Sequence, residues 1–213
     1  MFKLSKDGIR AAKIILLGIV LSLVLGKFLA ILGLGLILLF RDEKRIITNE
    51  KAVLAPVDGI ILSIDEDVNC NLISEINKKW TRITIVNGIL DIHTSRMPIS
   101  GKISDLIYTP GDNAGEALCQ KNEKISLFIS GAIECIISHN IETIFHNVSI
   151  KVQKGQIMQI GQTYANNTIG ATIELYLPSD LKILINEGQK VIAGETEITE
   201  DISTELFLES SKQ

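Results

Sequence analysis

The sequence predicts a mainly β domain, a sandwich or barrel, preceded by an N-terminal helical hairpin embedded in a membrane. Three observations predict this: an apolar run at residues 14–40, short β-branched runs after residue 46, and an uneven distribution of charge. Of the 213 residues, 46% are hydrophobic, 22% are charged and only four are proline. This composition excludes a disordered or collagen-like chain.

Charge divides the chain into two parts. The first 45 residues hold eight basic and three acidic residues, whereas the remainder holds 13 basic and 22 acidic residues. A basic, apolar N-terminus on an acidic body is typical of a membrane-associated protein. It argues against nucleic-acid binding, for which a basic domain is expected.

The apolar run at residues 14–40 favours a hairpin over a single helix. One straight helix of this length would measure about 40 Å, whereas the hydrocarbon core of a bilayer is about 30 Å thick. It would also place Lys27 near the bilayer centre, at a cost of about 2.5–3.5 kcal/mol. A turn near Gly26-Lys27 avoids both problems, and a tilted single span is the alternative.

The residues that flank the apolar run indicate its orientation. Basic residues lie at both ends, which places both ends on the cytoplasmic side. A cleaved signal peptide is disfavoured because no Ala-x-Ala-like site follows a short apolar core. The body is therefore expected on the cytoplasmic face of a membrane.

The body after residue 46 has the pattern of a β protein. Alternation of apolar and polar residues is clear in Arg82-Ile83-Thr84-Ile85 and in Ile173-Glu174-Leu175-Tyr176-Leu177. Many short strands between Gly, Asn or Pro turns favour a sandwich or barrel. The expected strands are residues 59–64, 81–86, 125–129, 133–137 and 172–177.

Part of the body is repeated. Residues 152–162 and 185–195 share an apolar-x-x-Gly-Gln pattern followed, after four more residues, by a second glycine. Each block predicts a strand, a turn, a short strand and another turn, and the turns at Pro56–Gly59 and Pro98–Lys102 each lead into an apolar strand. Such blocks resemble the half-motifs of lipoyl/biotinyl-type barrel-sandwich hybrid domains, which supports an architecture and not a function.

The cysteines and histidines do not form a metal-binding pattern. Cys70, Cys119 and Cys135 are odd in number and widely spaced, so we expect free, mostly buried thiols. His139 and His146 are expected to be structural, and no metal is expected.

Several short motifs occur in one order along the chain. They are Phe-Arg-Asp at 40–42, Ala-Pro-Val-Asp-Gly at 55–59, Asp-Ile-His-Thr-Ser-Arg-Met-Pro at 91–98, Ser-Gly-Lys at 100–102, Tyr-Thr-Pro-Gly-Asp at 108–112, Asn-Glu-Lys at 122–124, Ile-Gly-Ala-Thr at 169–172 and Glu-Leu-Tyr-Leu-Pro at 174–178. The ordered set resembles phosphatidylserine decarboxylase of the short bacterial form. With this resemblance, we expect a membrane anchor at 1–45, a phosphatidylserine decarboxylase-like β-sandwich domain at 46–200 and an acidic tail at 201–213.

The resemblance implies a lipid reaction and a covalent cofactor. Members of the family cut themselves before a serine, which becomes a pyruvoyl group at the new N-terminus. This carbonyl forms a Schiff base with phosphatidylserine and accepts the electrons released with CO₂, leaving phosphatidylethanolamine. The implied partner is therefore a membrane phospholipid, with no nucleic acid and a possible homodimer.

The resemblance also implies the site residues. Asp58 would orient or stabilise a catalytic histidine, and His93 would donate or accept a proton near the reacting carbonyl. Arg96 and Thr172 are candidate substrate-binding residues. An ordinary turn aspartate and a structural histidine remain open as alternatives for Asp58 and His93.

The cleavage position departs from the family. Gly170-Ala171 stands where the family has glycine and serine. Alanine has no hydroxyl, so Ala171 can neither form the ester nor become a pyruvoyl group. Thr172 could in principle attack the carbonyl of Ala171, which would give a 2-ketobutyryl group. The sequence therefore predicts an uncleaved, inactive or trapped precursor, of natural or engineered origin.

Two other stretches of the sequence also depart from the family pattern. Residues 140–147 replace the Ala-Gly-Leu-x-Ala-Arg-Arg stretch usual in the short form, and Glu43 replaces a proline.

One alternative function is a membrane-anchored, non-enzymatic β-sandwich that binds a lipid or a protein. The other is a lipoyl-type membrane-fusion adaptor, although the chain has neither the long helical hairpin nor the lipoyl lysine of that class.

Overall fold

The computed structural model divides the chain into two compact units, Met1–Arg41 and Asp42–Gln213. Each unit is described by itself. The structure describes residues 20–31, 33, 44–70, 78–88, 91–110, 123–141, 148–167 and 171–202.

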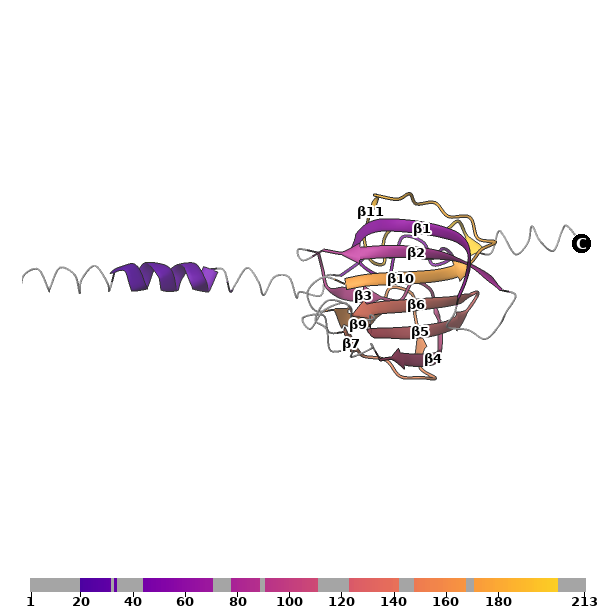
Figure 1. Cartoon of the computed structure of the whole chain (residues 1–213), viewed down its shortest axis with the longest axis horizontal. Coiled ribbons are helices and arrows are strands. Elements are labelled where there is room, and N and C mark those ends of the chain that lie inside the picture. Colours follow the sequence, from indigo (N-terminus) through magenta and orange to yellow (C-terminus); the bar gives the residue numbers. More distant parts are fainter. Residues whose placement is uncertain are drawn as a thin grey trace, which may run out of the picture. The chain divides into compact units, whose positions relative to one another are not determined.

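In the first unit, residues 20–31 form one continuous helix (Figure 1). The turn predicted near Gly26-Lys27 is therefore wrong. Lysine is a good helix former, and one glycine in a helix costs only about 1 kcal/mol. The rest of the predicted hairpin lies outside the described residues. Within the part of the chain that the structure describes, no helix is both long and apolar enough to cross a membrane.

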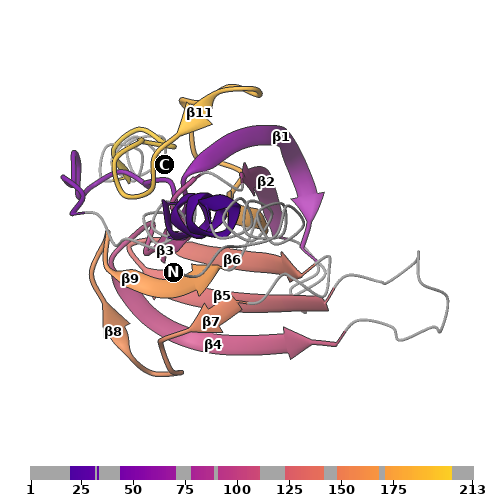
Figure 2. The same cartoon turned by 90° about the vertical axis from the view of Figure 1, so that its left-hand side faces the viewer.

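The second unit is mainly β, as predicted. Its large sheet is antiparallel, with the strand order β11-β1-β2-β10-β6-β5-β4-β8. A second sheet has the order β3-β9-β7. Viewed end-on, the large sheet is curled (Figure 2). The strands are β1 (Gly59–Asn69), β2 (Lys79–Asn87), β3 (Thr94–Arg96), β4 (Gly101–Thr109), β5 (Glu123–Gly131), β6 (Glu134–Ile141), β7 (Val148–Ile150), β8 (Ile157–Met158), β9 (Thr163–Asn167), β10 (Ala171–Pro178) and β11 (Lys190–Val191).

Alternating side chains build the core on the inner face of the large sheet. Ile83 of β2, Leu175 of β10, Ile137 of β6 and Leu127 of β5 form successive cross-strand partners and are fully buried. Burial of each such side chain contributes about 1.5–3 kcal/mol. Apolar packing therefore occupies the inner face along the middle of the sheet. The polar residues of the candidate site lie at one end of this face.

The two sequence repeats form equivalent corners. The amide of Gly155 donates to the carbonyl of Ile103 (2.7 Å), and that of Gly188 donates to the carbonyl of Ile61 (2.8 Å). Each repeat then forms a short strand, β8 or β11, which pairs with the start of β4 or β1. The predicted turn and short strand are thereby confirmed, whereas the strand predicted before each turn is wrong, because residues 151–153 and 184–186 belong to no strand.

The second turn of each repeat is also equivalent. Gly161 donates its amide to the carbonyl of Met97, and Gly194 donates to the carbonyl of Ala55, each at 2.9 Å. Both glycines have positive φ, +75° and +74°. An L side chain adopts this conformation only with strain, which explains why the repeat carries glycine there.

The correspondence extends to the side chains that close the corners. The carboxylate Oδ1 of Asp58 accepts the amide of Ala193 at 2.7 Å. In the other corner, the hydroxyl of Ser100 accepts the amide of Ile160 at 2.9 Å. Oδ1 of Asp58 therefore accepts the backbone amide that corresponds to the one bound by the hydroxyl of Ser100 in the other corner.

The outer face of the sheet carries a buried carboxylate. Glu174 of β10 accepts hydrogen bonds from Asn140 (3.1 Å), Tyr176 (2.9 Å) and Lys124 (3.3 Å). Burial by itself would raise the pKa of Glu174. The hydrogen bond from Asn140 and the charge of Lys124 outweigh it, so that the pKa lies below its ordinary value.

Glu174→Gln is expected to lower the free energy of unfolding at pH 7 by about 1–3 kcal/mol, because an amide leaves some of the three donors without an acceptor. A depressed folded pKa gives stability above the ordinary value of about 4.3, which is lost as the pH falls through the folded pKa. The variant should lose this dependence. Urea unfolding followed by fluorescence of Trp80, the single tryptophan, measures both effects. Glu66→Gln, at an exposed position of β1, is the control, and equal effects of both variants would contradict the assignment.

Candidate functional site

Asn87, the last residue of β2, connects three of the predicted site segments. Its side-chain amide donates to the carbonyls of Asp58 (2.7 Å) and Ile92 (3.1 Å). Its Cα is paired with that of Ala171 across the sheet. The structure thus brings Asp58, the residue preceding His93, and Ala171 around one buried side chain, which is 1% exposed.

Both oxygens of the Asp58 carboxylate have partners. Oδ1 accepts the amide of Ala193, and Oδ2 lies 2.7 Å from Nη2 of Arg45. Arg45 also lies 3.8 Å from the carboxylate of Glu195. The Asp58 and Arg45 side chains are only 12% and 10% exposed, so little solvent screens the pair. The predicted role of Asp58 in orienting a histidine stays a prediction.

His93 precedes β3 and is 3% exposed. Its carbonyl accepts the amide of Asn167 at 2.7 Å, and the side-chain amide of Asn167 donates to the hydroxyl of Ser95 at 3.1 Å. Asn167 therefore bonds the backbone of His93 and the side chain of Ser95, on the two sides of Thr94. The sequence singled out His93 but not Asn167.

Arg96, at the end of β3, lies against the glycine corners. Its amide donates to the carbonyl of Pro56 (2.7 Å), and its Nη1 donates to the carbonyl of Gly161 (3.0 Å). A Cβ added at Gly194 would lie 3.3 Å from Cδ of Arg96. These contacts hold Arg96 firmly, and its predicted contact with substrate stays a prediction.

Ala171 and Thr172 begin β10 and face opposite sides of the sheet. Ala171 is 5% exposed and shares the inner face with Ile173, since side chains alternate along a strand. Thr172 lies on the outer face and is paired with Val86 and Asn140. Gly170 lies outside the described residues.

A buried polar pair lies on the inner face near Ala171. His139 of β6 is the cross-strand partner of Ile173, and its Nε2 lies 2.7 Å from the hydroxyl of Tyr164. Both side chains are fully buried. Burial lowers the pKa of His139 to about 4, partly opposed by Asn167. Burial also raises the pKa of Tyr164. The pair is therefore neutral at neutral pH. His146 lies outside the described residues.

The described residues contain no group of three or more His, Cys, Asp or Glu side chains able to hold a metal ion. Cys70 and Cys135 are buried, and burial raises the pKa of the Cys135 thiol. A buried, neutral thiol is a poor nucleophile. Cys119 lies outside the described residues.

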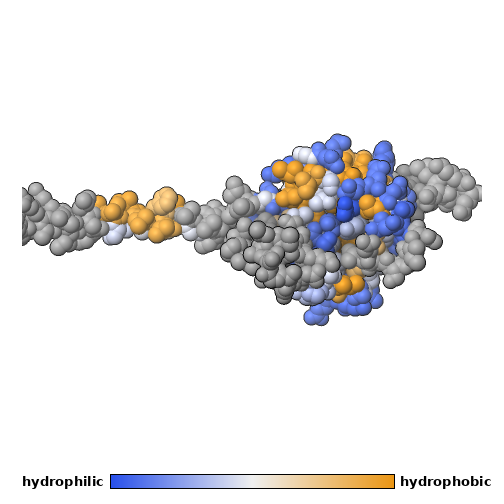
Figure 3. Space-filling view, viewed as in Figure 1, coloured by the Kyte–Doolittle hydropathy of each residue, from blue (hydrophilic) through white to orange (hydrophobic). Residues whose placement is uncertain are grey.

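An apolar patch lies on the outer face at the same end of the sheet as Thr172. It consists of Ile60 and Leu62 of β1 and Val86 of β2, which are 51%, 62% and 37% exposed. Ile60 is paired with Val86, and Val86 with Thr172. Figure 3 shows apolar side chains gathered on the body and on the described N-terminal helix. An exposed apolar patch marks a surface for contact with an apolar phase or partner.

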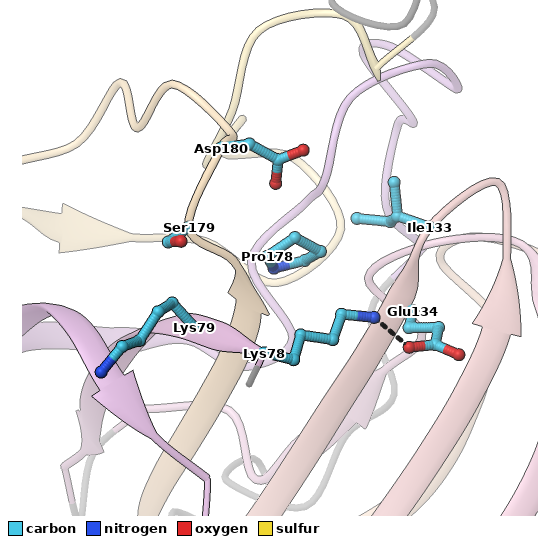
Figure 4. A pocket seen from close by; sticks show the side chains of 7 residues that line it. All are labelled: Lys78, Lys79, Ile133, Glu134, Pro178, Ser179 and Asp180. Atoms are coloured by element: carbon cyan, nitrogen blue, oxygen red, sulfur yellow. Dashed lines mark hydrogen bonds and ion pairs between the residues drawn. The ribbon is translucent and has the colours of Figure 1, made fainter. Parts of the chain in front are cut away.

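A pocket of about 410 Å³ lies at the opposite end of β10, which starts at Ala171 and ends at Pro178. In Figure 4, the side chain of Lys78 reaches Glu134, while that of Lys79 points away. Seven residue steps separate Ala171 from Pro178, about 23 Å along the strand. This pocket is therefore separate from the residues gathered around Asn87. Its lining residues are Lys78, Lys79, Ile133, Glu134, Pro178, Ser179 and Asp180.

Comparisons with known proteins agree on one family. A family model described as phosphatidylserine decarboxylase matches residues 36–199. The chain is 30% identical over 209 residues to a phosphatidylserine decarboxylase proenzyme of Erythrobacter litoralis, covering 87% of this chain and 80% of that protein. It is 33% identical over 165 residues to the proenzyme of Pelodictyon phaeoclathratiforme, covering 74% of each. It is 32% identical over 165 residues to the proenzyme of Wolbachia pipientis, covering 74% and 71%.

His139 is expected to make the stability of the protein depend on pH. Its ordinary pKa is about 6.5, whereas the folded value is about 4. The unfolded chain therefore binds more protons in this window, and stability is lost as the pH falls from 6.5 towards 4. The loss should amount to about 3 kcal/mol.

His139→Gln keeps a hydrogen-bonding group near Tyr164 but does not titrate, so it should flatten the pH dependence between 6.5 and 4 in urea unfolding. Tyr164→Phe removes the hydroxyl and leaves the imidazole, so it should keep the slope. A slope unchanged by His139→Gln would contradict this assignment.

Proposed function

The chain belongs to the phosphatidylserine decarboxylase family, and on that premise we propose that it binds phosphatidylserine at the residues gathered around Asn87 and remains uncleaved. The resemblance of its ordered motifs to this family is confirmed by the comparisons. One observation carries the proposal: Asn87 ties Asp58, the segment of His93 and Ala171 together. These are the segments that the family resemblance predicts for the site.

The family's pyruvoyl group does not fit the residue at the cleavage position. Ala171 ends at a methyl group, so it supplies neither the attacking hydroxyl nor the oxygen that leaves in the elimination. The nearest hydroxyl in sequence, on Thr172, lies on the other face of β10. This placement favours an intact chain over cleavage by Thr172, and an intact chain has no pyruvoyl carbonyl with which to decarboxylate the lipid.

The ion pair of Arg45 and Asp58 and the imidazole of His93 give the site polar groups suited to a charged headgroup. Phosphatidylserine carries an ammonium, a carboxylate and a phosphate, so hydrogen-bonding and charged groups of both signs are needed. The exposed patch of Ile60, Leu62 and Val86 adjoins the same end of the sheet. An apolar patch there suits a protein that meets its ligand at a bilayer.

The proposed protein has three parts with separate roles. Residues 1–45 anchor the protein, residues 46–200 form the lipid-binding β domain, and residues 201–213 form a tail. The β domain lies on the cytoplasmic face of a bacterial inner membrane, and a homodimer is possible. In this proposal the chain is a trapped precursor whose site lacks only the serine hydroxyl. A second candidate function, supported by the same missing hydroxyl, is a membrane-anchored, non-enzymatic β-sandwich that binds a lipid or a protein and whose other residues do not support the reaction either.

Restoring the hydroxyl separates a trapped precursor from a non-enzymatic protein. The chain as written is expected to run as one band in denaturing electrophoresis. Ala171→Ser is expected to split near Gly170 and to release CO₂ from phosphatidylserine if the rest of the site is competent. Ala165→Ser, which adds a hydroxyl at another fully buried alanine, should stay intact.

Two results would contradict a trapped precursor. Spontaneous splitting of the unaltered chain would refute the uncleaved state. An intact, inactive Ala171→Ser variant would favour the non-enzymatic lipid-binding function over a trapped precursor.

Lipid selectivity tests binding without requiring catalysis. The full-length chain is expected to co-sediment with vesicles of phosphatidylserine and phosphatidylcholine several-fold better than with vesicles that replace phosphatidylserine by phosphatidylglycerol at equal charge. His93→Ala should reduce this preference while leaving binding to both vesicles above that of a protein without an anchor. Equal binding to both anionic vesicles would show charge attraction alone and would contradict the headgroup site.

A further inference from the structure

The segment after the apolar N-terminus is seated on both glycine corners of the β domain. A Cβ added at Gly161 would lie 2.1 Å from Cδ1 of Ile47, and one added at Gly194 would lie 3.8 Å from Cβ of Arg45. Glu195, next to Gly194, accepts the amide of Ile46 at 3.4 Å. The two equivalent turns therefore form the surface on which residues 45–47 lie.

Within this segment, Arg45 makes the contact that reaches the candidate site. Its Nη2 lies 2.7 Å from Oδ2 of Asp58, with both side chains largely buried. The backbone carbonyl of Asp58 is bound by Asn87, the partner of Ala171. Arg45 is therefore separated from the strand position of Ala171 by only two residues, Asp58 and Asn87.

The internal repeat shows which part of this arrangement the fold requires. In the corresponding corner, Ser100 closes the turn with an uncharged hydroxyl. The turn at Asp58 thus needs one acceptor, Oδ1, for the amide of Ala193. The second oxygen and its negative charge are additional to the fold, and the guanidinium of Arg45 is the group that holds them.

We propose that Arg45 is a positioning residue: it fixes the Asp58 carboxylate, so that the site is assembled only when the segment following the apolar N-terminus is seated on the β domain. The proposal rests on the proposed function, because it assigns a role for Asp58 in that site. A planar guanidinium suits this role, since it binds a carboxylate in a defined orientation that an ammonium does not impose. The membrane-proximal segment is then part of the site and not only a tether.

Amide hydrogen exchange in the full-length chain, measured by NMR in lipid nanodiscs, tests the positioning role. The amide of Ala193 reports on Asp58, and the amide of Ile160 reports on Ser100 in the equivalent corner. Arg45→Gln is expected to speed exchange at Ala193 at least about tenfold while leaving Ile160 within about twofold. Arg45→Lys should restore part of the protection.

A second pair of variants keeps the test independent of overall stability. Asp58→Ser copies the uncharged corner, so adding Arg45→Gln to it should leave exchange at Ala193 unchanged. Equal acceleration at Ala193 and Ile160, no acceleration at Ala193, or an equal effect of Arg45→Gln in the Asp58→Ser background would each overturn the proposal.

Self-cleavage separates this proposal from the proposed function. In a chain carrying Ala171→Ser, Arg45→Gln is expected to slow splitting at least about tenfold, with Arg45→Lys intermediate. If Ala171→Ser alone does not split, the trapped-precursor interpretation fails, and the exchange measurements alone decide the role of Arg45.

Discussion

The side-chain amide of Asn87 is the interaction on which the arrangement of the candidate site depends. A backbone carbonyl away from strand pairing still needs a donor when it is buried, and one NH₂ group supplies donors to two of them. By bonding the carbonyls of Asp58 and Ile92, Asn87 joins the turn before β1 to the loop before β3. Its own backbone is held in β2 opposite Ala171. Asn87 thus holds together three segments that are far apart in sequence. Their own side chains need not contact one another.

Because the glycine corner occurs twice, the contacts that the fold requires can be distinguished from those found only at the candidate site. Both corners use glycines at positive φ and one side-chain oxygen that accepts a backbone amide. Ser100 supplies that oxygen without charge. Asp58 supplies it with a charge that then requires Arg45, because an unpaired buried carboxylate is costly. A corner that serine can close does not by itself require aspartate, and this is the reason for proposing that the extra oxygen of Asp58 belongs to the site.

The sequence was sufficient for the strands because their side chains alternate between a buried and an outer face, and β1, β2, β5, β6 and β10 lie where that pattern predicts. It also located the glycine corners, since positive φ restricts the residue type. It did not locate Asn87, because an asparagine before glycine at a strand end has the pattern of an ordinary turn. It did not predict the pairing of Arg45 with Asp58 either, since that contact depends on how the chain returns over the glycine corners. The turn expected at Gly26-Lys27 was wrong. A lysine at the bilayer centre is costly, but neither glycine nor lysine interrupts a helix, and the helix continues through both.

Ala171 belongs to a candidate site whose other parts are held by interactions that do not involve its side chain. The position of Ala171 is set by pairing of β10 with β2 and β6, that of Asp58 by Asn87 and Ala193, and that of the chain at His93 by Asn167. None of these contacts uses a side-chain oxygen at position 171. Under the proposed function, the missing hydroxyl at position 171 prevents cleavage while the surrounding geometry stays supported. The proposed lipid site therefore does not depend on the reaction, because the contacts that shape it do not involve the atom that would react.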